Sequence, residues 1–388
     1  MLGFRWSEGM FSYCLKKHTK LIFIDLQLYY ITHPLFLSNQ SIYLVVWNMT
    51  ESEKEIVESV DYWMRAISLK APESVVVLVG THLDRIEEIE SKQIPQQLMN
   101  EYNKLITKSF CVSSITGEGM NELREYLLDL AIQRQIDIPT PWLQLGQKLN
   151  EMKSTPTIGM DELRNVIKSS SISIDEQTTT TAIRVLHNLG YLLYYPPSLD
   201  DDIKQDLVIL DPQWLVNILK AVVTVKNVEA INKGWLSHAK ANLSNLWPQC
   251  KPEIHSFLLG LLYRFRIAIK SKGQSLIPCR LDQVPQTTMN QFTQLIYQMD
   301  FPHILPEDLF PTFIASPKAL QYLNLENNTI WRDAAILQDD LGKNERIFIR
   351  AGGKNIKIFG SRLSEVVVEV IAFIIKLISN NWPGIIDK

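Results

Sequence analysis

Hydrophobic and polar positions follow two alternating patterns in the first third of the chain. Short apolar runs are typical of buried strands, and the stretches between them place apolar residues at helical spacing. The predicted strands are 20–26, 41–49, 74–80 and 109–114, and the predicted helices are 53–69, about 90–106 and 119–132. Near-continuous apolar strands separated by helices predict a parallel sheet with helices on both faces.

The pattern changes at the segment DIPTPW (137–142), where two prolines within three residues end a helix and mark a linker. Helices are predicted next, and two short strands and a further helix follow them. A region of mixed strands and helices comes last, from about residue 275. The helices are 142–152, 159–170, 175–190 and 212–223, the short strands are 191–195 and 206–210, and the later strands are 274–281, 329–337, 346–351 and 356–360.

These patterns divide the chain into four predicted parts. An incomplete parallel α/β domain covers residues 1–135, and a linker covers 136–143. Residues 144–250 form a helical part in which helices followed by a hairpin resemble a winged helix-turn-helix. Residues 251–388 form an α+β part.

Composition narrows the class of protein. The 388 residues carry a net charge of −3, with 46% hydrophobic and 21% charged residues, which is ordinary for a soluble globular protein and argues against a dedicated nucleic-acid binder. The four cysteines are far apart and fit reduced thiols in a cytoplasmic protein. The apolar stretch 366–379 contains Glu369 and Lys376 and is shorter than the ~20 residues of a membrane span, so we expect a buried amphipathic helix and no membrane span.

Two polar loops follow neighbouring predicted strands. Thr81, His82 and Asp84 follow the strand 74–80, and the segment SSITGEG (113–119) follows the next one. In an open parallel sheet, ligands bind beyond the carboxyl ends of the strands. A carboxylate fixed there accepts both N–H groups on one edge of guanine, whereas adenine leaves it unpaired.

In this interpretation Asp84 selects guanine, the His82 side chain covers the face of the base, and Thr81 ties the two loops together. The backbone N–H of Ser114 binds the guanine carbonyl oxygen. The alternative is that Thr81 and Asp84 cap the helix that follows.

The segments GTHLD (80–84) and FCVSSITGEGMNELR (110–124) resemble the guanine-specificity loops of Ras-like GTPases. More narrowly, they resemble the Roc domain of Roco proteins, in which T-H-x-D stands in place of N-K-x-D. Residues 29–52 are similar to the Roc segment that follows the catalytic D-x-x-G-Q. The second half resembles the COR domain that accompanies Roc, most clearly at 207–223, 305–316 and 330–337.

The resemblance runs from about residue 22 to the C-terminus. It implies an α/β Ras-like domain with an incomplete sheet, followed by an α+β COR-like region that contains the winged-helix-like part. It implies binding of GTP or GDP, a homodimer formed through the COR half, and other signalling proteins as partners. The residues that it places on the base are Thr81, His82, Asp84, Ser113 and Ser114.

The phosphate side of such a site departs from the family pattern. The sequence has no G-x-x-x-x-G-K-[ST], the loop whose amides and Lys hold the phosphates and whose Ser/Thr holds Mg²⁺. Asp25 and Gln27 are candidate remnants of the catalytic D-x-x-G-Q, but its glycine is missing. We therefore expect weak or lost GTP and GDP binding, negligible hydrolysis and no bound Mg²⁺. Two explanations stay open: a degenerate member of the family, or a sequence that has lost the start of its Roc domain.

Three other functions were weighed against this one. In the first alternative, the chain is a fragment of a larger Roco serine/threonine kinase. The sequence itself contains no G-x-G-x-x-G-x-V, H-R-D or D-F-G. In the second it is a dimerisation module that binds no nucleotide. DNA binding by the winged helix is disfavoured, because the helix 175–190 offers Arg184 and His187 against Asp175 and Glu176.

Overall fold

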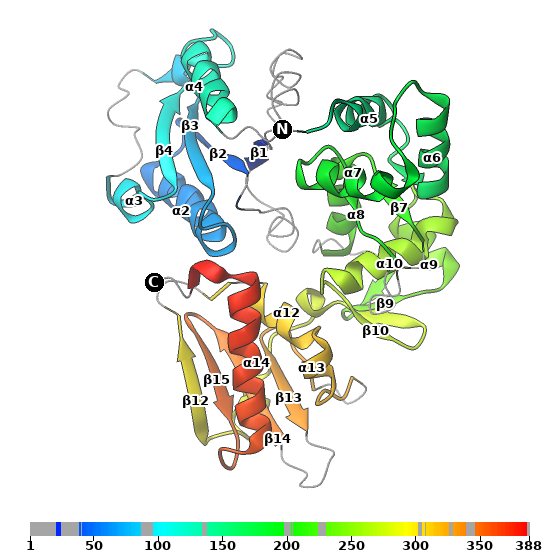
Figure 1. The fold of residues 1–388 in the computed structure, drawn as a ribbon. Helices are drawn as coiled ribbons and strands as arrows, with labels where there is room; N and C mark the ends of the chain where they lie inside the picture. Colours follow the sequence, from blue (N-terminus) through cyan, green and yellow to red (C-terminus); the bar gives the residue numbers. More distant parts are fainter. Residues whose placement is uncertain are drawn as a thin grey trace. The chain divides into compact units, whose positions relative to one another are not determined.

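The computed structural model forms two compact units, which are described one at a time (Figure 1). Among the described residues, the first unit runs to Tyr195 and includes Leu207–Pro212, and the second contains the rest. The described residues are 21–24, 39, 41–86, 96–133, 138–197, 203, 205–223, 230–301, 305–306, 308–325, 329–338 and 346–385.

A four-stranded parallel sheet begins the first unit, as the sequence predicts. Its strands lie in the order β1-β2-β3-β4, and all neighbouring pairs are parallel. The predicted strand 109–114 begins three residues earlier in the structure, so Ser113 and Ser114 follow the strand and belong to a loop. The strands are β1 (Leu21–Ile24), β2 (Ile42–Asn48), β3 (Val75–Thr81) and β4 (Ile106–Cys111).

Helices cover both faces of this sheet, because successive side chains of a strand point to opposite faces. Tyr43, Val45 and Trp47 of β2 pack in one core with α2 and α3. Ile42 and Leu44 of the same strand pack in a second core with α4. A capping box of Ser52 and Glu55 begins α2. The helices are α2 (Glu53–Lys70), α3 (Gln96–Glu101) and α4 (Met120–Gln133).

The rest of the first unit combines three helices with a small antiparallel sheet. The strands lie in the order β5-β7-β6. Apolar faces of the three helices share one core with the sheet, through residues such as Leu145, Leu163, Ile183 and Val208. The elements are α5 (Thr140–Glu151), β5 (Thr157–Gly159), α6 (Met160–Ser169), α7 (Glu176–Asn188), β6 (Leu193–Tyr194) and β7 (Leu207–Ile209).

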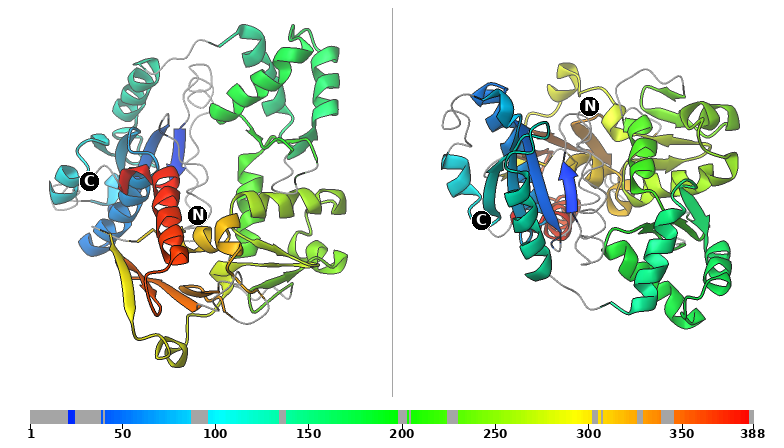
Figure 2. Two further views of the ribbon diagram at one scale, coloured as in Figure 1. Left: turned by 60° about the horizontal axis from the view of Figure 1, so that its bottom comes forward. Right: turned by 90° about the horizontal axis from the view of Figure 1, so that it is seen from above.

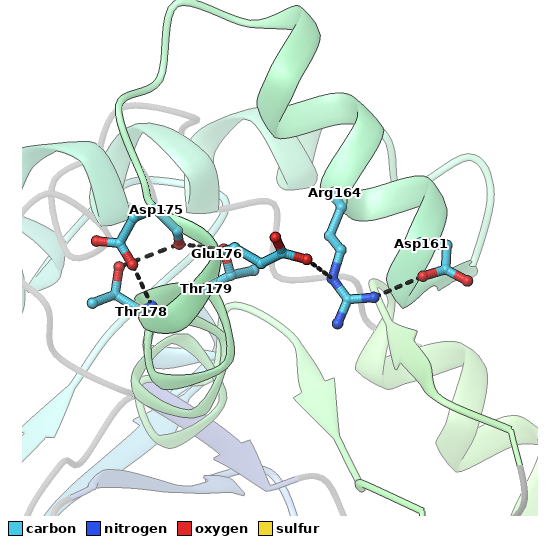
Figure 3. A network of polar contacts seen from close by, with 6 residues as sticks. All are labelled: Asp161, Arg164, Asp175, Glu176, Thr178 and Thr179. Carbon is cyan, nitrogen blue, oxygen red and sulfur yellow. Dashed lines mark hydrogen bonds and ion pairs between the residues drawn. The ribbon is translucent and has the colours of Figure 1, made fainter.

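The first turn of α7 is acidic and is joined to α6 by one arginine (Figure 3). Arg164 Nη1 donates to Asp161 Oδ1 at 2.7 Å, and its Nε lies 4.0 Å from Glu176 Oε1. Asp175 caps the helix, since its Oδ1 accepts the backbone N–H of Thr178 at 2.7 Å. That hydrogen bond lowers the pKa of Asp175, so the end of α7 stays negatively charged.

The second unit begins with helices around an antiparallel sheet of short strands in the order β10-β11-β9-β8. The predicted strand 274–281 is only half correct: Pro278 starts a 3-10 turn after three residues of β11, because proline cannot donate to a ladder. The elements are α8 (Pro212–Val223), β8 (Ile231–Asn232), β9 (Trp235–Ser237), α9 (Lys240–Leu246), α10 (His255–Arg264), β10 (Ile269–Ser271) and β11 (Gln274–Leu276).

A larger antiparallel sheet ends the second unit, with α14 lying across it (Figures 1 and 2). The strands lie in the order β12-β15-β14-β13. The apolar stretch 366–379 forms most of α14, and no helix in the described ranges is long and apolar enough to cross a membrane. The elements are α11 (Gln286–Met289), β12 (Leu295–Asp300), α12 (Leu309–Ile314), α13 (Pro317–Leu320), β13 (Ala334–Gln338), β14 (Arg346–Gly352), β15 (Asn355–Phe359) and α14 (Glu365–Asn381).

The buried His255 predicts a loss of stability in mild acid. Burial lowers the pKa of its imidazole and Lys240 acts in the same direction, although a hydrogen bond to the Cys250 carbonyl and the charge of Glu253 oppose them. The unfolded chain, with an ordinary histidine pKa of about 6.5, therefore takes up a proton before the folded chain does. The free energy of unfolding is expected to fall as the pH drops below about 6.5.

Urea denaturation at about pH 7.5 and about pH 5.5 measures this fall. The variant His255→Gln removes the titrating group, so its stability should depend less on pH than that of the wild type. An equal pH dependence in both proteins would contradict the assignment.

Candidate functional site

The carboxyl end of β3 is joined to β2 by close packing and a hydrogen bond. A Cβ on Gly80 would lie 2.8 Å from the Trp47 ring and 2.9 Å from the Met49 side chain, so only glycine fits beneath them. The Thr81 hydroxyl donates to the Trp47 carbonyl oxygen at 2.9 Å. These contacts fix the point at which the chain leaves the sheet.

The chain turns sharply at His82, which has a φ of 65°. Histidine is among the few non-glycine residues that adopt this left-handed conformation with some frequency. The backbone N–H of Leu83 then donates to the Val112 carbonyl at 3.1 Å, across to the end of β4. The single 3-10 turn Leu83–Arg85 that follows leaves the side chain of Asp84 exposed.

Ser113 joins the two loops through its hydroxyl. The side chain is fully buried, and its Oγ donates to Asp84 Oδ1 at 2.6 Å. The same oxygen accepts the backbone N–H groups of Ile115 at 3.2 Å and Thr116 at 3.1 Å. Because its one proton is committed to the carboxylate, Ser113 positions Asp84 and has no proton left to donate to a ligand.

The hydrogen bond from Ser113 lowers the pKa of Asp84, and Arg85 and His82 act in the same direction, whereas desolvation opposes them. Asp84 is therefore ionised at neutral pH and presents a carboxylate that is an acceptor only. Ser114 is exposed, and its backbone N–H makes no hydrogen bond within the described part of the chain. A fixed anionic acceptor and an available N–H donor thus lie on adjacent loops.

The structure brings together all five residues that the sequence predicts for the base, which are Thr81, His82, Asp84, Ser113 and Ser114, at the carboxyl ends of β3 and β4. Asp25 and Gln27 lie outside the described residues. His, Cys, Asp and Glu side chains in the described ranges form no group of three or more that could hold a metal ion.

One detail of the sequence interpretation differs from the structure. Thr81 was expected to tie the two loops, but its hydrogen bonds with described residues go to Trp47 and, at 3.1 Å, to His82 Nδ1, and Ser113 makes the tie. The capping alternative places Thr81 and Asp84 as caps of the helix that follows. No side chain caps the turn Leu83–Arg85, and the residues immediately before α3 lie outside the described ranges.

The sequence analysis did not single out Gly119, which closes the second loop. Its φ is 71°, and a Cβ there would lie only 2.1 Å from the carbonyl oxygen of Cys111 at the end of β4. Gly117, two residues earlier, has a similar φ of 81° but open space around it. The repeated glycines of the segment GEG were the available signal for two left-handed positions.

These two glycines form a matched pair for mutation. Gly117→Ala should cost about 1–2 kcal/mol of unfolding free energy, because only the left-handed conformation is strained. Gly119→Ala should cost more, about 3 kcal/mol or above, because the methyl group also collides with Cys111. Urea denaturation of both variants measures the difference, and equal losses would show that the close approach at Gly119 is relieved cheaply.

Comparison with known proteins identifies the family. Residues 139–281 match the family described as C-terminal of Roc, COR-A domain. The chain is 30% identical over 357 residues to probable serine/threonine-protein kinase pats1 of Dictyostelium discoideum. This alignment covers 84% of this chain and 11% of that protein. It is 29% identical over 262 residues to probable serine/threonine-protein kinase roco6 of the same organism. This alignment covers 62% of this chain and 12% of that protein.

The chain thus spans about a tenth of the length of these relatives. Among solved structures, Methanosarcina barkeri Roco2 RocCORdC bound to GDP is 22% identical, with a TM-score of 0.46 over 65% of this chain and 76% of that one. The matched COR-A segment and the two Dictyostelium relatives show that the chain is a Roc–COR protein of the Roco family.

Proposed function

We propose that this chain is a guanine-nucleotide-binding regulatory module of intracellular signalling, with Asp84 as the residue that selects the base. The carboxylate held at 2.6 Å by the buried Ser113 is the observation that carries the proposal. Guanine presents two N–H donors on one edge, and an ionised carboxylate accepts both. The N–H of Ser114, which has no partner in the described part of the chain, is a matching donor for the guanine carbonyl oxygen.

The proposal gives the other predicted residues distinct roles. Thr81 and Ser113 are positioning residues, since their hydroxyls hold the strand end and the carboxylate. His82 makes the turn and is proposed to cover the face of the base. A ligand that lacks either N–H of guanine leaves a carboxylate contact unmade. Adenine lacks both, and this gives selectivity against it.

The phosphate groups are proposed to contribute little. Most nucleotide affinity in P-loop sites comes from oriented amides and a lysine, and the sequence contains no G-x-x-x-x-G-K-[ST]. We therefore propose weak binding of GTP and GDP without Mg²⁺, and negligible hydrolysis. Asp25 and Gln27 stay candidates for the remnant of the catalytic segment.

The architecture supports two finer proposals. A parallel sheet with helices on both faces supports a Ras-like domain. The order α5-β5-α6-α7-β6-β7, with its antiparallel sheet, supports a winged-helix-like part. The negative charges at the start of α7, Asp175 and Glu176, favour a structural part over one that binds nucleic acid (Figure 3).

The two relatives are named as probable protein kinases, and this chain corresponds to a small share of each. Its sequence contains no G-x-G-x-x-G-x-V, H-R-D or D-F-G. A piece of a larger Roco serine/threonine kinase is therefore an alternative in which this part regulates and another part phosphorylates. We place the module in the cytoplasm, with other signalling proteins as partners.

The proposed base selectivity is tested by exchanging one atom of Asp84. Xanthine has an N–H and a carbonyl where guanine has two N–H groups, so the amide of Asp84→Asn complements xanthine. In calorimetric titrations at millimolar ligand, the wild type should bind GDP and reject both ADP and xanthosine diphosphate. Asp84→Asn should lose affinity for GDP by about tenfold or more and gain it for xanthosine diphosphate.

Submicromolar GDP affinity that depends on Mg²⁺ would contradict the proposed weak phosphate contacts. Equal binding of GDP and ADP by the wild type would remove the role of Asp84. Asp84→Ala serves as the control, because it should weaken GDP binding without gaining xanthosine diphosphate.

A homodimer through the COR half is the second proposal. On α14, Val368 is 51% exposed and Ile375 is 47% exposed, and residues seven apart lie on one side of a helix. Light scattering after size exclusion, at tens of micromolar, should give the mass of two chains. The double variant Val368→Glu with Ile375→Glu should shift the mass toward one chain, because it places charge on that side. Asp84→Ala should leave the mass unchanged, and a wild type that is strictly monomeric would end the proposal.

A further inference from the structure

The part of the second unit that surrounds its first sheet is strongly basic. Strands β8 to β11 and helices α9 and α10 span residues 231–276, all of which the structure describes (Figure 1). This range contains seven lysine and arginine residues and one acidic residue, Glu253, which gives it a net charge of +6. The whole chain carries −3, so the rest of it carries −9. A charge asymmetry of this size within one chain indicates a surface for an anionic partner.

Three of these lysines lie at one end of the sheet. β10 and β11 form a hairpin, with Lys270 in β10 and Lys272 in the turn. The backbone N–H of His238, directly after β9, donates to the carbonyl of Gly273 in this turn at 3.0 Å. Helix α9 then begins at Lys240. The side chains of Lys240, Lys270 and Lys272 are exposed, and we call these three residues the lysine cluster.

His238 lies beside the lysine cluster and is neutral at pH 7. Its Nε2 lies 2.7 Å from Ser275 Oγ, which lies 2.8 Å from the Tyr263 hydroxyl. Burial lowers the pKa of the His238 imidazole, and the charge of Lys270 acts in the same direction. The positive charge at this end of the sheet therefore comes from the lysines.

Two members of the lysine cluster have no internal counter-ion. Lys240 and Lys272 form no ion pair within the described part of the chain. An anion that approaches these two ammonium groups displaces only water and breaks no existing ion pair. The attraction between the lysine cluster and an anionic surface is therefore not offset by the loss of an internal contact.

Any partner of this surface is held by charge and not by apolar contact. The exposed large hydrophobic residues of the described chain all lie outside 231–276. A protein–protein interface has an apolar centre, and this range offers none. Anionic membranes and nucleic acids carry many negative charges and can be bound without such a centre.

The type of cation favours the membrane over a nucleic acid. The exposed cations of the range are all lysines, whereas Arg264 and Arg266 are half-buried. Nucleic-acid sites commonly add arginines that hold a phosphate with two hydrogen bonds, and aromatic rings on which bases stack. The aromatic residues of this range are all buried or half-buried. Lipid headgroups move within the bilayer and can approach a flexible lysine one by one, so no fixed fork or ring is needed.

We propose that the lysine cluster binds the anionic headgroups of a membrane surface as a peripheral contact. The cytoplasmic leaflet carries a negative surface potential, and each lysine close to it raises the affinity by about fivefold. A contact of this kind is reversible and sensitive to salt, because nothing is inserted into the hydrocarbon region. It requires no bound nucleotide and is independent of the guanine site.

The first experiment measures sedimentation of the full chain with lipid vesicles. The wild type should bind vesicles that contain about 30% phosphatidylserine and should not bind vesicles of phosphatidylcholine alone. Raising the salt from about 0.05 M to about 0.5 M should release it, because the charges are then screened. Equal binding to both kinds of vesicle, or binding that survives the higher salt, would overturn the proposal.

The second experiment removes the lysine cluster. The triple variant Lys240→Gln, Lys270→Gln and Lys272→Gln should bind the phosphatidylserine vesicles about tenfold more weakly or worse. Its melting temperature should equal that of the wild type, since all three side chains are exposed. A folded triple variant that binds like the wild type would remove the role of the cluster.

A matched control separates the position of the charges from their number. Three exposed lysines outside 231–276 give a variant with the same net charge, Lys104→Gln, Lys168→Gln and Lys354→Gln. Its binding to the same vesicles should stay within about twofold of the wild type. A loss as large as that of the cluster variant would show that only the total charge of the chain matters, and the assignment to the cluster would fail.

Titration of a single-stranded DNA oligonucleotide tests the other anionic partner. At about 0.15 M salt we expect no binding of the oligonucleotide that depends on the lysine cluster. If the wild type binds it and the cluster variant does not, while phosphatidylserine vesicles are left unbound, the surface recognises nucleic acid and the membrane proposal is overturned.

Discussion

Burial on both faces of the parallel sheet is the constraint that decides where polar chemistry lies in the first unit. Leu44, Val77 and Leu78 have no exposed surface, and a charged side chain among them would need a buried partner. Polar groups are therefore confined to the positions where the strands end. Parallel strands bring those ends to one edge, and this is why Asp84 and Ser113, which are 29 residues apart in sequence, meet there.

The sequence pattern predicts the long elements well because their apolar spacing persists over many residues, as it does in β2, β3, α2 and α4. It places β4 three residues late because Thr107, Lys108 and Ser109 are exposed in the middle of that strand and break the apolar run. Strands of two or three residues, such as β6 and β8, are too short to show any period. At the candidate site, residue types at strand ends were predictable. The hydrogen bond from the Ser113 hydroxyl to Asp84 was not, because it depends on how two distant loops approach.

Pairing between strands, and not order along the chain, decides where the first unit ends. β7 belongs to it because Leu207–Ile209 pair with both β5 and β6. The second unit nevertheless continues from Gln213, the second residue of α8. Helix α8 starts only a few positions after the end of β7. A cut after Tyr195 would therefore remove the central strand of a three-stranded sheet. Experiments on this protein are best made on the full chain for that reason.

The backbone hydrogen bonds that join β3 to β4 have a consequence for sequence divergence. Val112 donates its N–H to Gly80 at 2.7 Å, and its carbonyl accepts the N–H of Leu83 at 3.1 Å. Any residue other than proline can donate such a backbone N–H, so these two hydrogen bonds do not depend on which side chains stand at Leu83 and Val112. Only a few side chains, Asp84 and Ser113 foremost, carry the chemical identity of the site. The backbone links between the two loops and the chemical identity of the site can therefore diverge separately in evolution.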